Sequence, residues 1–545
     1  MKIFFTIIII LLCIAQTASG QSWQWARAAT GSNTGSVVCS DASGNAYVAG
    51  YFVGSLALGT DTVTDNNGPY QNIFIAKYDP SGNILWVRSC SGYADVEGIS
   101  ADASGNAYVV GNFYNDSVSF GSTTLVNPDH GGQNSNIYFT KYDASGNVIW
   151  AKNLGGINND LAAGVSTDAF GHVYVTGNFT SDSLTFGNIT VHHIGSSDGF
   201  VAKFTSAGDA LWIRNVGAPV SIGSVAICTD AAGSVIMTGY FQYNYMYVGS
   251  LSTMISSPYS NNIFITKYDS SGLNQWRRYV GNNYGISPTG IAADSSGNVY
   301  VTGFYNDTLI WGSATLASLG FQNIFTAQYN ASGSVMWAKS AGGNYVDQSN
   351  GISTDPAGNS YITGYFQSDT SRFDSTLLLN TSGNQITFVT KYDQSGKVDW
   401  AIAPIGNSNN SGAGISYNNV GVYLTGNFRS SSIVFTTDTL PSSEQGFYLA
   451  KLDTTTIILT GINTIHTPSD KIQVYPNPST GTIYFGGLTY GTNIVVYNML
   501  GENMITSSPH GQTDIINLSS CNKGIYFYTI YEQGNIIQKG KIVLE

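Results

Sequence analysis

Short runs of apolar residues alternate with polar turn sequences along most of the chain. The runs are rich in Val, Ile, Tyr and Phe, as at residues 46–52 and 73–78, a composition that suits a pleated, buried surface. The polar sequences combine Asp, Ser, Gly and Asn, which form tight turns because Asp bonds the backbone two residues on and Gly and Asn accept positive φ. Beyond the first residues, no stretch keeps a helical period, so the pattern predicts an all-β protein.

The pattern repeats with a period of 61 to 64 residues, most clearly at one tryptophan position. This position is occupied by Trp25, Trp86, Trp150, Trp212, Trp276, Trp337 and Trp400. A fixed period of this size indicates a repeat architecture, in which each unit buries its apolar face against its neighbours. The count predicts seven units.

Two motifs make up each unit. The first, Asp-Ala-Ser-Gly-Asn-Ala-Tyr-Val-Ala-Gly, occupies residues 41–50 and returns at 102–111, 168–177, 230–239, 294–303, 355–364 and, without its Asp, 417–426. The second, Asn-Ile-Phe-Ile-Ala-Lys-Tyr-Asp-Pro-Ser-Gly-Asn-Ile-Leu-Trp, occupies residues 72–86 and returns at 136–150, 199–212, 262–276, 323–337, 386–400 and, without its Trp, 446–453. Each motif predicts two strands joined by a turn, so each unit has four strands, A to D. Four antiparallel strands form one blade of a β-propeller.

The connection between strands B and C is long, which makes the period longer than that of an ordinary blade. A weaker motif recurs within it, as Ser119-Phe120-Gly121, Thr185-Phe186-Gly187 and Ile310-Trp311-Gly312. This motif leaves open whether each blade gains a small extra hairpin.

The last unit stops at Asp453 and lacks a strand D, whereas a spare strand lies near the start of the chain. Residues 23–27, Trp-Gln-Trp-Ala-Arg, resemble residues 149–152, Ile-Trp-Ala-Lys, from a complete unit. We therefore expect the N-terminal strand to complete blade seven. This closure would remove two exposed sheet edges, which otherwise promote aggregation.

The repeats resemble the SBBP family of bacterial β-propeller repeats, whose pattern is G-I-x-x-D-x-x-G-N-x-Y-V-T-G followed by F-x-x-K-Y-D-x-x-G-x-x-x-W. Residues 290–303, Gly-Ile-Ala-Ala-Asp-Ser-Ser-Gly-Asn-Val-Tyr-Val-Thr-Gly, fit the first part well. The resemblance covers about residues 22–453. It implies a seven-bladed propeller and usually an extracellular location, but the family has no assigned chemistry.

The chain begins with features of a secretory signal peptide. Lys2 precedes a mostly apolar run at residues 3–15, and Ala18-Ser19-Gly20 offers small residues for cleavage. The run is shorter than the about 20 apolar residues that span a bilayer. The expected organisation is a signal peptide at 1–20, the propeller at 21–453, a Thr-rich linker at 454–470 and a separate domain at 471–545.

The C-terminal segment resembles the type A sorting domain of the type IX secretion system of Bacteroidetes. The residues that carry this resemblance are Tyr475, Pro476, Asn477, Pro478, Gly481, the Asn-Met-Leu-Gly sequence at 498–501, Gly524, Tyr526 and Lys541. The resemblance implies a small Ig-like β-sandwich that is recognised by the outer-membrane secretion machinery. It also implies a protein that is released into the medium or held at the outer cell surface.

Composition narrows the possible partners. Only 10% of residues are charged and the net charge is −12, whereas nucleic-acid binding needs a basic face. A surface of Asn, Ser, Thr, Gly and Tyr suits glycan or protein ligands. We expect a monomer with no nucleic-acid partner.

Few residues suggest chemistry. The recurrent turn Asp could be a calcium ligand, but a calcium loop needs several oxygen ligands at close spacing, so we favour a hairpin turn. Strand C carries a recurrent Lys, and pairing with the turn Asp is doubtful because unit five keeps Asp294 beside Gln328 while unit seven keeps Lys451 without the Asp. The six histidines suggest no combination of nucleophile, base and orienting group. We therefore predict no catalytic, cofactor or metal residues and no enzyme.

The B-to-C and D-to-A connections are long and differ between units, whereas the A-to-B and C-to-D turns vary little. Binding residues concentrate on loops held by a rigid scaffold, so we place the ligand face on these connections, with Tyr70, Tyr284 and Tyr345 as candidates. The expected function is a non-catalytic binding or adhesion module. The alternatives are a lyase or hydrolase that uses the axial pocket, or a structural component of a surface layer or matrix.

Overall fold

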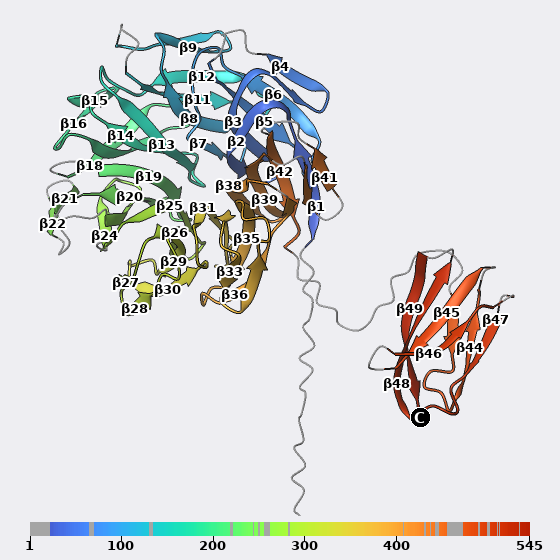
Figure 1. Ribbon diagram of the computed structural model, residues 1–545. Helices are drawn as coiled ribbons and strands as arrows, with labels where there is room; N and C mark the ends of the chain where they lie inside the picture. Colours follow the sequence, from blue (N-terminus) through green and yellow to red (C-terminus); the bar gives the residue numbers. More distant parts are fainter. Residues whose placement is uncertain are drawn as a thin grey trace, which may run out of the picture. The chain divides into compact units, whose positions relative to one another are not determined.

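The computed structural model describes residues 22–545 apart from several internal segments (Figure 1). These segments are residues 65–69, 130–133, 219–221, 243–244, 249–250, 255–261, 282–283, 407, 430–431, 436–437, 442–445, 455–471, 489–490, 499–501, 510, 512 and 533–534. The predicted signal peptide and nearly all of the predicted linker lie outside the described residues. The chain divides into two compact units, up to Ile457 and from Ile458 onwards.

The first unit is a ring of seven antiparallel blades, each with four core strands ordered A-B-C-D outwards from the axis (Figure 1). Hairpin strands extend two of these sheets, to five strands in blade 1 and to six in blade 3. Blade 1 comprises β2 (Thr30–Ser40), β3 (Ala46–Leu58), β5 (Asn72–Tyr78) and β6 (Ile84–Ser89), and blade 2 comprises β7 (Gly98–Ala101), β8 (Ala107–Phe113), β11 (Asn136–Tyr142) and β12 (Val148–Asn153). Blade 3 comprises β13 (Asp160–Thr167), β14 (Val173–Phe179), β17 (Asp198–Phe204) and β18 (Ala210–Gly217). Blade 4 comprises β19 (Ile222–Thr229), β20 (Val235–Phe241), β23 (Asn262–Tyr268) and β24 (Asn274–Gly281). Blade 5 comprises β25 (Ile286–Ala293), β26 (Val299–Tyr305), β29 (Asn323–Tyr329) and β30 (Val335–Ala341). Blade 6 comprises β31 (Asp347–Thr354), β32 (Ser360–Phe366), β35 (Ile386–Tyr392) and β36 (Val398–Ile402). Blade 7 comprises β38 (Asn410–Asn418), β39 (Gly421–Phe428), β42 (Gly446–Leu452) and β1 (Trp23–Ala28). The predicted seven-bladed propeller is confirmed.

Blade 7 closes the ring as predicted. Its outer strand is β1, which pairs antiparallel with β42 and sets Trp25 opposite Lys451 and Ala28 opposite Tyr448. The first and last repeats therefore share one sheet. At the axis, β2 of blade 1 lies against β38 of blade 7, just as the other A strands adjoin their neighbours.

Among the described residues, the recurrent tryptophan joins a blade to the next at six of the seven junctions. In blade 1, Trp86 donates from Nε1 to the carbonyl of Ala144 at 3.1 Å, in the C-to-D turn of blade 2. Its ring lies over Gly146 of that turn, where an added Cβ would come within 2.7 Å of the indole. Arg88 donates from Nε to the carbonyl of the same glycine at 2.8 Å. The period of the Trp therefore reflects a contact that recurs between blades.

Each B-to-C connection forms an extra two-stranded hairpin, which answers the question left open by the sequence. These hairpins pair β3 with β4 (Asp61–Thr64), β9 (Ser117–Phe120) with β10 (Thr123–Val126), β15 (Ser183–Phe186) with β16 (Ile189–His192), β21 (Tyr245–Val248) with β22 (Leu251–Met254), β27 (Leu309–Trp311) with β28 (Ala314–Leu316), β33 (Thr370–Phe373) with β34 (Thr376–Leu379), and β40 (Ser432–Phe435) with β41 (Asp438–Pro441). Apolar residues such as Phe120 and Trp311 are buried against their blades. Some hairpins also pair with the preceding blade, as β21 does with β18 and β40 with β37 (Ile405–Gly406).

The second unit is a β-sandwich of two antiparallel sheets. One contains β43 (Gln473–Tyr475), β44 (Thr482–Gly486) and β47 (Thr513–Asn517), and the other contains β46 (Asn503–Ser507), β45 (Thr492–Tyr497), β48 (Gly524–Glu532) and β49 (Asn535–Leu544). Its core includes Phe485, Ile494, Ile530 and Ile542. The predicted Ig-like sandwich is confirmed. Nowhere in the described parts of either unit is there a helix with the length and apolar character needed to cross a membrane.

Candidate ligand-binding surfaces

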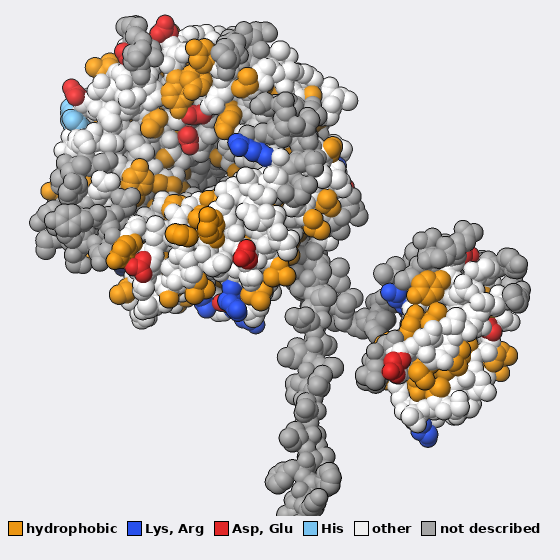
Figure 2. Space-filling view, viewed as in Figure 1, with side chains coloured by type: hydrophobic (Ala, Val, Ile, Leu, Met, Phe, Trp, Pro, Cys, Tyr) orange, Lys and Arg blue, Asp and Glu red, His pale blue; other side chains and the backbone are white. Residues whose placement is uncertain are grey.

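The two ends of the ring differ in what they present. The A-to-B and C-to-D turns lie at one end, called the turn end, and the B-to-C and D-to-A connections lie at the other, called the loop end. Figure 2 shows one face of the ring around a central hollow, with hydrophobic side chains in separate patches and few charged groups.

At the turn end, the recurrent Asp organises its own turn. Asp41 accepts hydrogen bonds from the backbone N–H groups of Ser43 and Asn45 at Oδ1, at 3.0 and 2.9 Å. Its Oδ2 accepts from Asn45 Nδ2 at 2.8 Å. The same bonds form at Asp102, Asp294 and Asp355. Within the described residues, no group of three or more His, Cys, Asp and Glu is arranged to hold a metal ion.

The recurrent Lys pairs with the turn Asp in two blades, which corrects in part the doubt expressed from the sequence. Lys77 Nζ lies 3.6 Å from Asp41, and Lys267 Nζ lies 2.8 Å from Asp230. In blade 6, Lys391 instead pairs with Asp399. The pairing varies because the ammonium has further partners that do not depend on the turn Asp. Lys451, which has no turn Asp, donates to the carbonyl of Pro80 in blade 1 at 3.1 Å.

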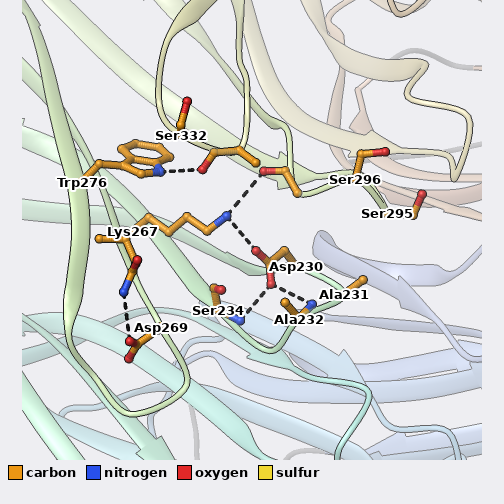
Figure 3. Close-up of a pocket in the computed structure, with 13 residues that line it drawn as sticks. Asp230, Ala231, Ala232, Ser234, Lys267, Asp269, Trp276, Ser295, Ser296 and Ser332 are labelled. Atoms are coloured by element: carbon orange, nitrogen blue, oxygen red, sulfur yellow. Dashed lines mark hydrogen bonds and ion pairs between the residues drawn. The ribbon is translucent and has the colours of Figure 1, made fainter.

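The recurrent Lys and Asp residues line cavities between neighbouring blades. The cavity drawn in Figure 3 lies between blades 4 and 5 and has a volume of about 730 Å³. Lys267 reaches across it to Asp230, while Trp276 donates to the carbonyl of Ala331 at 2.9 Å (Figure 3). A second such cavity, around Lys141, joins blades 1, 2 and 3. These residues recur because they hold blades together, so the cavities follow from the repeat.

The axial channel is narrow, with a volume of about 200 Å³. Each A strand contributes three residues to its wall, such as Glu97, Gly98 and Ile99 from blade 2. Gly98 is required there, because an added Cβ would lie 2.8 Å from the backbone nitrogen of Val165 in blade 3. Of the described residues that line the channel, Glu97 alone is charged.

Glu97 and Asp95 form an acidic pair at the loop end of the channel. Asp95 accepts from the backbone N–H of Asn112 at 2.9 Å and from the Tyr114 hydroxyl. Glu97 Oε1 lies 3.5 Å from Asn112 Nδ2. The Glu97 side chain is exposed towards the channel, yet protein surrounds much of the carboxylate. This burial raises the pKa of Glu97 to about 8, and the charge of Asp95 adds to the effect. Burial also raises the pKa of Asp95.

Three tyrosines continue from this pair towards solvent. The ring of Tyr93 lies 4.8 Å from that of Tyr114, and Tyr70 stacks on Tyr93 with 5.4 Å between ring centroids. Tyr70 is 51% exposed. The predicted ligand residue Tyr70 therefore stands at the outer end of a connected row that reaches Asp95.

A second aromatic pair lies between blades 5 and 6 at the loop end. Tyr345, another predicted ligand residue, is 50% exposed and meets the 68% exposed Phe321 edge-to-face, with centroids 5.6 Å apart. Gln348 lies beyond it and hydrogen-bonds Gln322 and Tyr365. Tyr284 is 65% exposed in the connection between blades 4 and 5.

The structure thus puts each predicted tyrosine in the expected kind of connection, but at separate places on the ring. The residues predicted from the sequence do not include Asp95, Glu97, Tyr93, Tyr114 and Phe321. Aligning the seven A strands with one another would have revealed Glu97, because the other units have an uncharged residue at its position.

In the C-terminal unit, the predicted sorting residues converge from both ends of the domain. Asn477 donates to the carbonyl of Lys541 at 2.6 Å and accepts from the N–H of Val543 at 2.8 Å. The carbonyl of Gly481 accepts from the N–H of Leu518 at 2.6 Å, and a Cβ on Gly481 would lie 2.4 Å from Ser519 Oγ.

Two aromatic residues of the sorting motif take different positions. Tyr475, the residue before Pro476, stacks on Tyr484 at the surface, with 5.7 Å between centroids. Tyr526, two residues after Gly524, is buried and donates to the carbonyl of Asn522 at 2.7 Å. Pro476, Pro478 and Lys541 lie at or near the surface.

Comparison with known families finds the secretion system C-terminal sorting domain over residues 473–545. It also finds the SBBP β-propeller repeat over residues 275–303 and 324–365. Both families are those that the sequence motifs resemble.

Among curated proteins, an uncharacterized WD repeat-containing protein of Acanthamoeba polyphaga mimivirus is 25% identical over 496 residues, which cover 74% of this chain and 36% of that protein. Among solved structures, the Pan2 WD40 domain of Neurospora crassa has 7% identity and a TM-score of 0.38, with 77% of this chain and 89% of that chain covered. PorZ, a surface component of the type IX secretion system of Porphyromonas gingivalis, has 13% identity and a TM-score of 0.26, with 95% and 74% covered.

Proposed function

Since the chain carries SBBP propeller repeats and a type IX sorting domain that directs it to the cell surface or the medium, we propose that its propeller is a non-catalytic module that binds glycans. The observation that carries this proposal is the pair of exposed aromatic sites, Tyr70 on Tyr93 and Phe321 against Tyr345, at the loop end. The secretion machinery interacts with the sorting domain, whereas the propeller acts after export.

The chemistry of these sites suits sugars. Aromatic faces offer large contact area together with a polar tip on Tyr, and the apolar face of a pyranose ring can stack on them. Gln348 and Tyr365 lie near Tyr345, and Asp95 lies beyond Tyr93, so hydrogen-bonding groups accompany each ring.

An enzyme remains the second candidate, because Asp95 and Glu97 place two carboxyl groups at one end of the axis. A raised pKa suits a general acid, and glycosidases use pairs of carboxyl groups. Against this, both oxygens of Asp95 already accept hydrogen bonds, from Asn112 and Tyr114. These bonds hold Asp95 in place and lower the basicity of its carboxylate, so binding is the better supported function.

A glycan array probed with the mature chain tests the proposal. Tyr345→Ala and Phe321→Ala should weaken binding about two- to tenfold, the range expected from the loss of one aromatic contact. Met336→Ala serves as the control because Met336 is exposed on β30, away from the loop end. Melting temperatures should stay unchanged in all three variants.

Two results would contradict the binding function. Binding that responds only to changes in the Ser-Gly-Asn turns would move the ligand to the turn end. New reducing ends released from a polysaccharide by the wild type, but not by Glu97→Gln, would instead establish a hydrolase.

A further inference from the structure

Blade 2 departs from the other six blades at the loop end of the axial channel. The positions equivalent to Glu97 hold Ser36, Ala163, Val225, Thr289, Asn350 and Ala413. Because six blades pack with uncharged residues at this position, the propeller fold does not require the carboxylate of Glu97.

Asp95 also differs from the residues at the equivalent position in the other six blades, none of which is charged. Its equivalents are Thr34, Leu161, Gly223, Ser287, Gln348 and Ser411. The Asp95 carboxylate is held in place by the end of β8 and the residue that follows it, since Asn112 donates its backbone N–H to it and Tyr114 donates its hydroxyl. Asn112 is itself anchored, because its Oδ1 accepts from the N–H of Ala162 in blade 3 at 2.8 Å.

Within the described residues, neither carboxyl group has a basic partner. The ion pairs there involve other acidic residues, namely Asp41, Asp168, Asp209, Asp230, Asp399 and Asp438. Without a nearby positive charge, burial favours the protonated form of Glu97. An ammonium group of a ligand placed beside it would favour the charged carboxylate, which then releases its proton to solvent.

The row of tyrosines limits what this ligand is. It runs outwards from Asp95 through Tyr114 and Tyr93 to the exposed ring of Tyr70. A ligand that reaches both Glu97 and Tyr70 must therefore carry a cation at one point and a flat, stackable surface farther along. The channel of about 200 Å³ admits a small group but not a whole chain.

We propose that the loop end of the axial channel binds glycans that carry free, protonated amino groups, with one ammonium group at Glu97 and Asp95 and a neighbouring sugar ring on Tyr70. The inference rests on the proposed glycan-binding function and names the class of glycan. Tyr70 supplies the stacking surface, Glu97 a carboxyl group that loses its proton to solvent when the ammonium binds, and Asp95 a fixed second carboxylate.

Calorimetry with the mature chain near neutral pH tests this inference. The probes are a β-1,4-linked glucosamine hexamer and the N-acetylglucosamine hexamer of the same length. The amino hexamer should bind at least about tenfold more tightly, as expected for charge-assisted hydrogen bonds. Its binding should weaken at high salt.

Single substitutions distinguish the effect of the Glu97 carboxyl group on binding from an effect on folding. Glu97→Gln retains the shape of the side chain and should remove the preference for the amino hexamer, whereas Glu502→Gln, the same change in the C-terminal unit, should retain it. Tyr70→Ala should weaken binding of the amino hexamer while its melting temperature stays the same.

Other outcomes overturn the inference in distinguishable ways. Equal binding of both hexamers, unaffected by Glu97→Gln but weakened by Tyr345→Ala, would reject the amino-group site and leave glycan binding intact. A trilysine peptide that binds as tightly as the amino hexamer would indicate a cationic protein ligand. Failure of every glycan on an array to bind would reject the proposed function as well.

Discussion

Trp25 and Lys451 donate hydrogen bonds to the same oxygen, the carbonyl of Pro80, each at 3.1 Å. Trp25 belongs to the first strand of the described chain and Lys451 to the last strand of the propeller, while Pro80 lies in blade 1. One carbonyl thus ties both ends of the propeller to its first blade. Closure of the ring depends on contacts between its ends as well as on strand pairing.

Removal of the N-terminal strand should destabilise the propeller. Deletion of residues 23–29 exposes the edge of β42 and removes the buried Trp25, so we expect a loss of at least about 3–5 kcal/mol, as for large core truncations. Thermal unfolding of the mature chain measures it, with Gln24→Ala at an exposed position as the control. An unchanged melting temperature in the deletion variant would contradict an interlocked ring.

The glycine beneath each indole should tolerate no side chain. Gly82→Ala places a Cβ about 2.7 Å from Trp25 at φ +81°, whereas Gly171→Ala has φ +84° and nothing within 4 Å. Both changes carry the cost of positive φ, roughly 1 kcal/mol. We expect Gly82→Ala to lose a further 1–3 kcal/mol or so from overpacking. Equal melting temperatures would show that the indole contact contributes little.

The contribution of each lysine between blades to the free energy of unfolding should depend on how deeply its ion pair is buried. Lys267→Ala leaves the buried Asp230 without its partner and should cost about 3–5 kcal/mol. Lys152→Ala breaks an exposed pair with Asp209 and should cost no more than about 1 kcal/mol. Chemical denaturation of both variants makes the comparison. Similar losses would mean that the buried pair is not what stabilises this junction.

Stability should depend on pH through Glu97. Its pKa is about 8 when folded against an ordinary value of 4.5, so the folded state holds a proton that the unfolded state releases between these values. Stability is therefore lost as pH rises from 4.5 towards 8. The titratable groups that face Glu97 are Asp95, Tyr114 and Tyr138.

Glu97→Gln should abolish this contribution. Because channel water screens the carboxylate, we expect the variant to gain about 1 kcal/mol over the wild type at pH values above 8 and nothing below 4.5. Melting curves of both proteins across this range measure the difference. A gain that is the same at every pH would indicate a packing effect instead of a titration.

Export should require the C-terminal domain. Removal of residues 473–545 should leave a folded propeller in the periplasm, because the sorting domain and the propeller are separate compact units. Asn477→Ala should lower export while Asn503→Ala should not, since the Asn477 side chain, unlike that of Asn503, bonds the start of the domain to its last strand. Cell fractionation measures both, and surface display of the truncated chain would contradict the prediction.

The sequence alone determined the features that depend on local bonding and periodicity. The Asp-x-Ser-Gly-Asn turns, the four strands of each blade and their sevenfold repetition follow from neighbouring residues. The spare strand at Trp23–Ala28 could also be assigned by its likeness to other D strands. The Tyr-Pro-Asn-Pro sequence marked the sorting domain in the same local way.

Only the tertiary structure decided which distant side chains meet. Tyr70 and Tyr93 lie in different connections, and they stack because blades 1 and 2 adjoin at the loop end. The position of Glu97 in the channel wall follows from ring closure, which brings seven A strands to one axis. Likewise, Lys77 meets both Asp41 and a neighbouring blade through side-chain geometry that spacing does not encode. Contacts between blades depend on packing in three dimensions, so no local pattern specifies them.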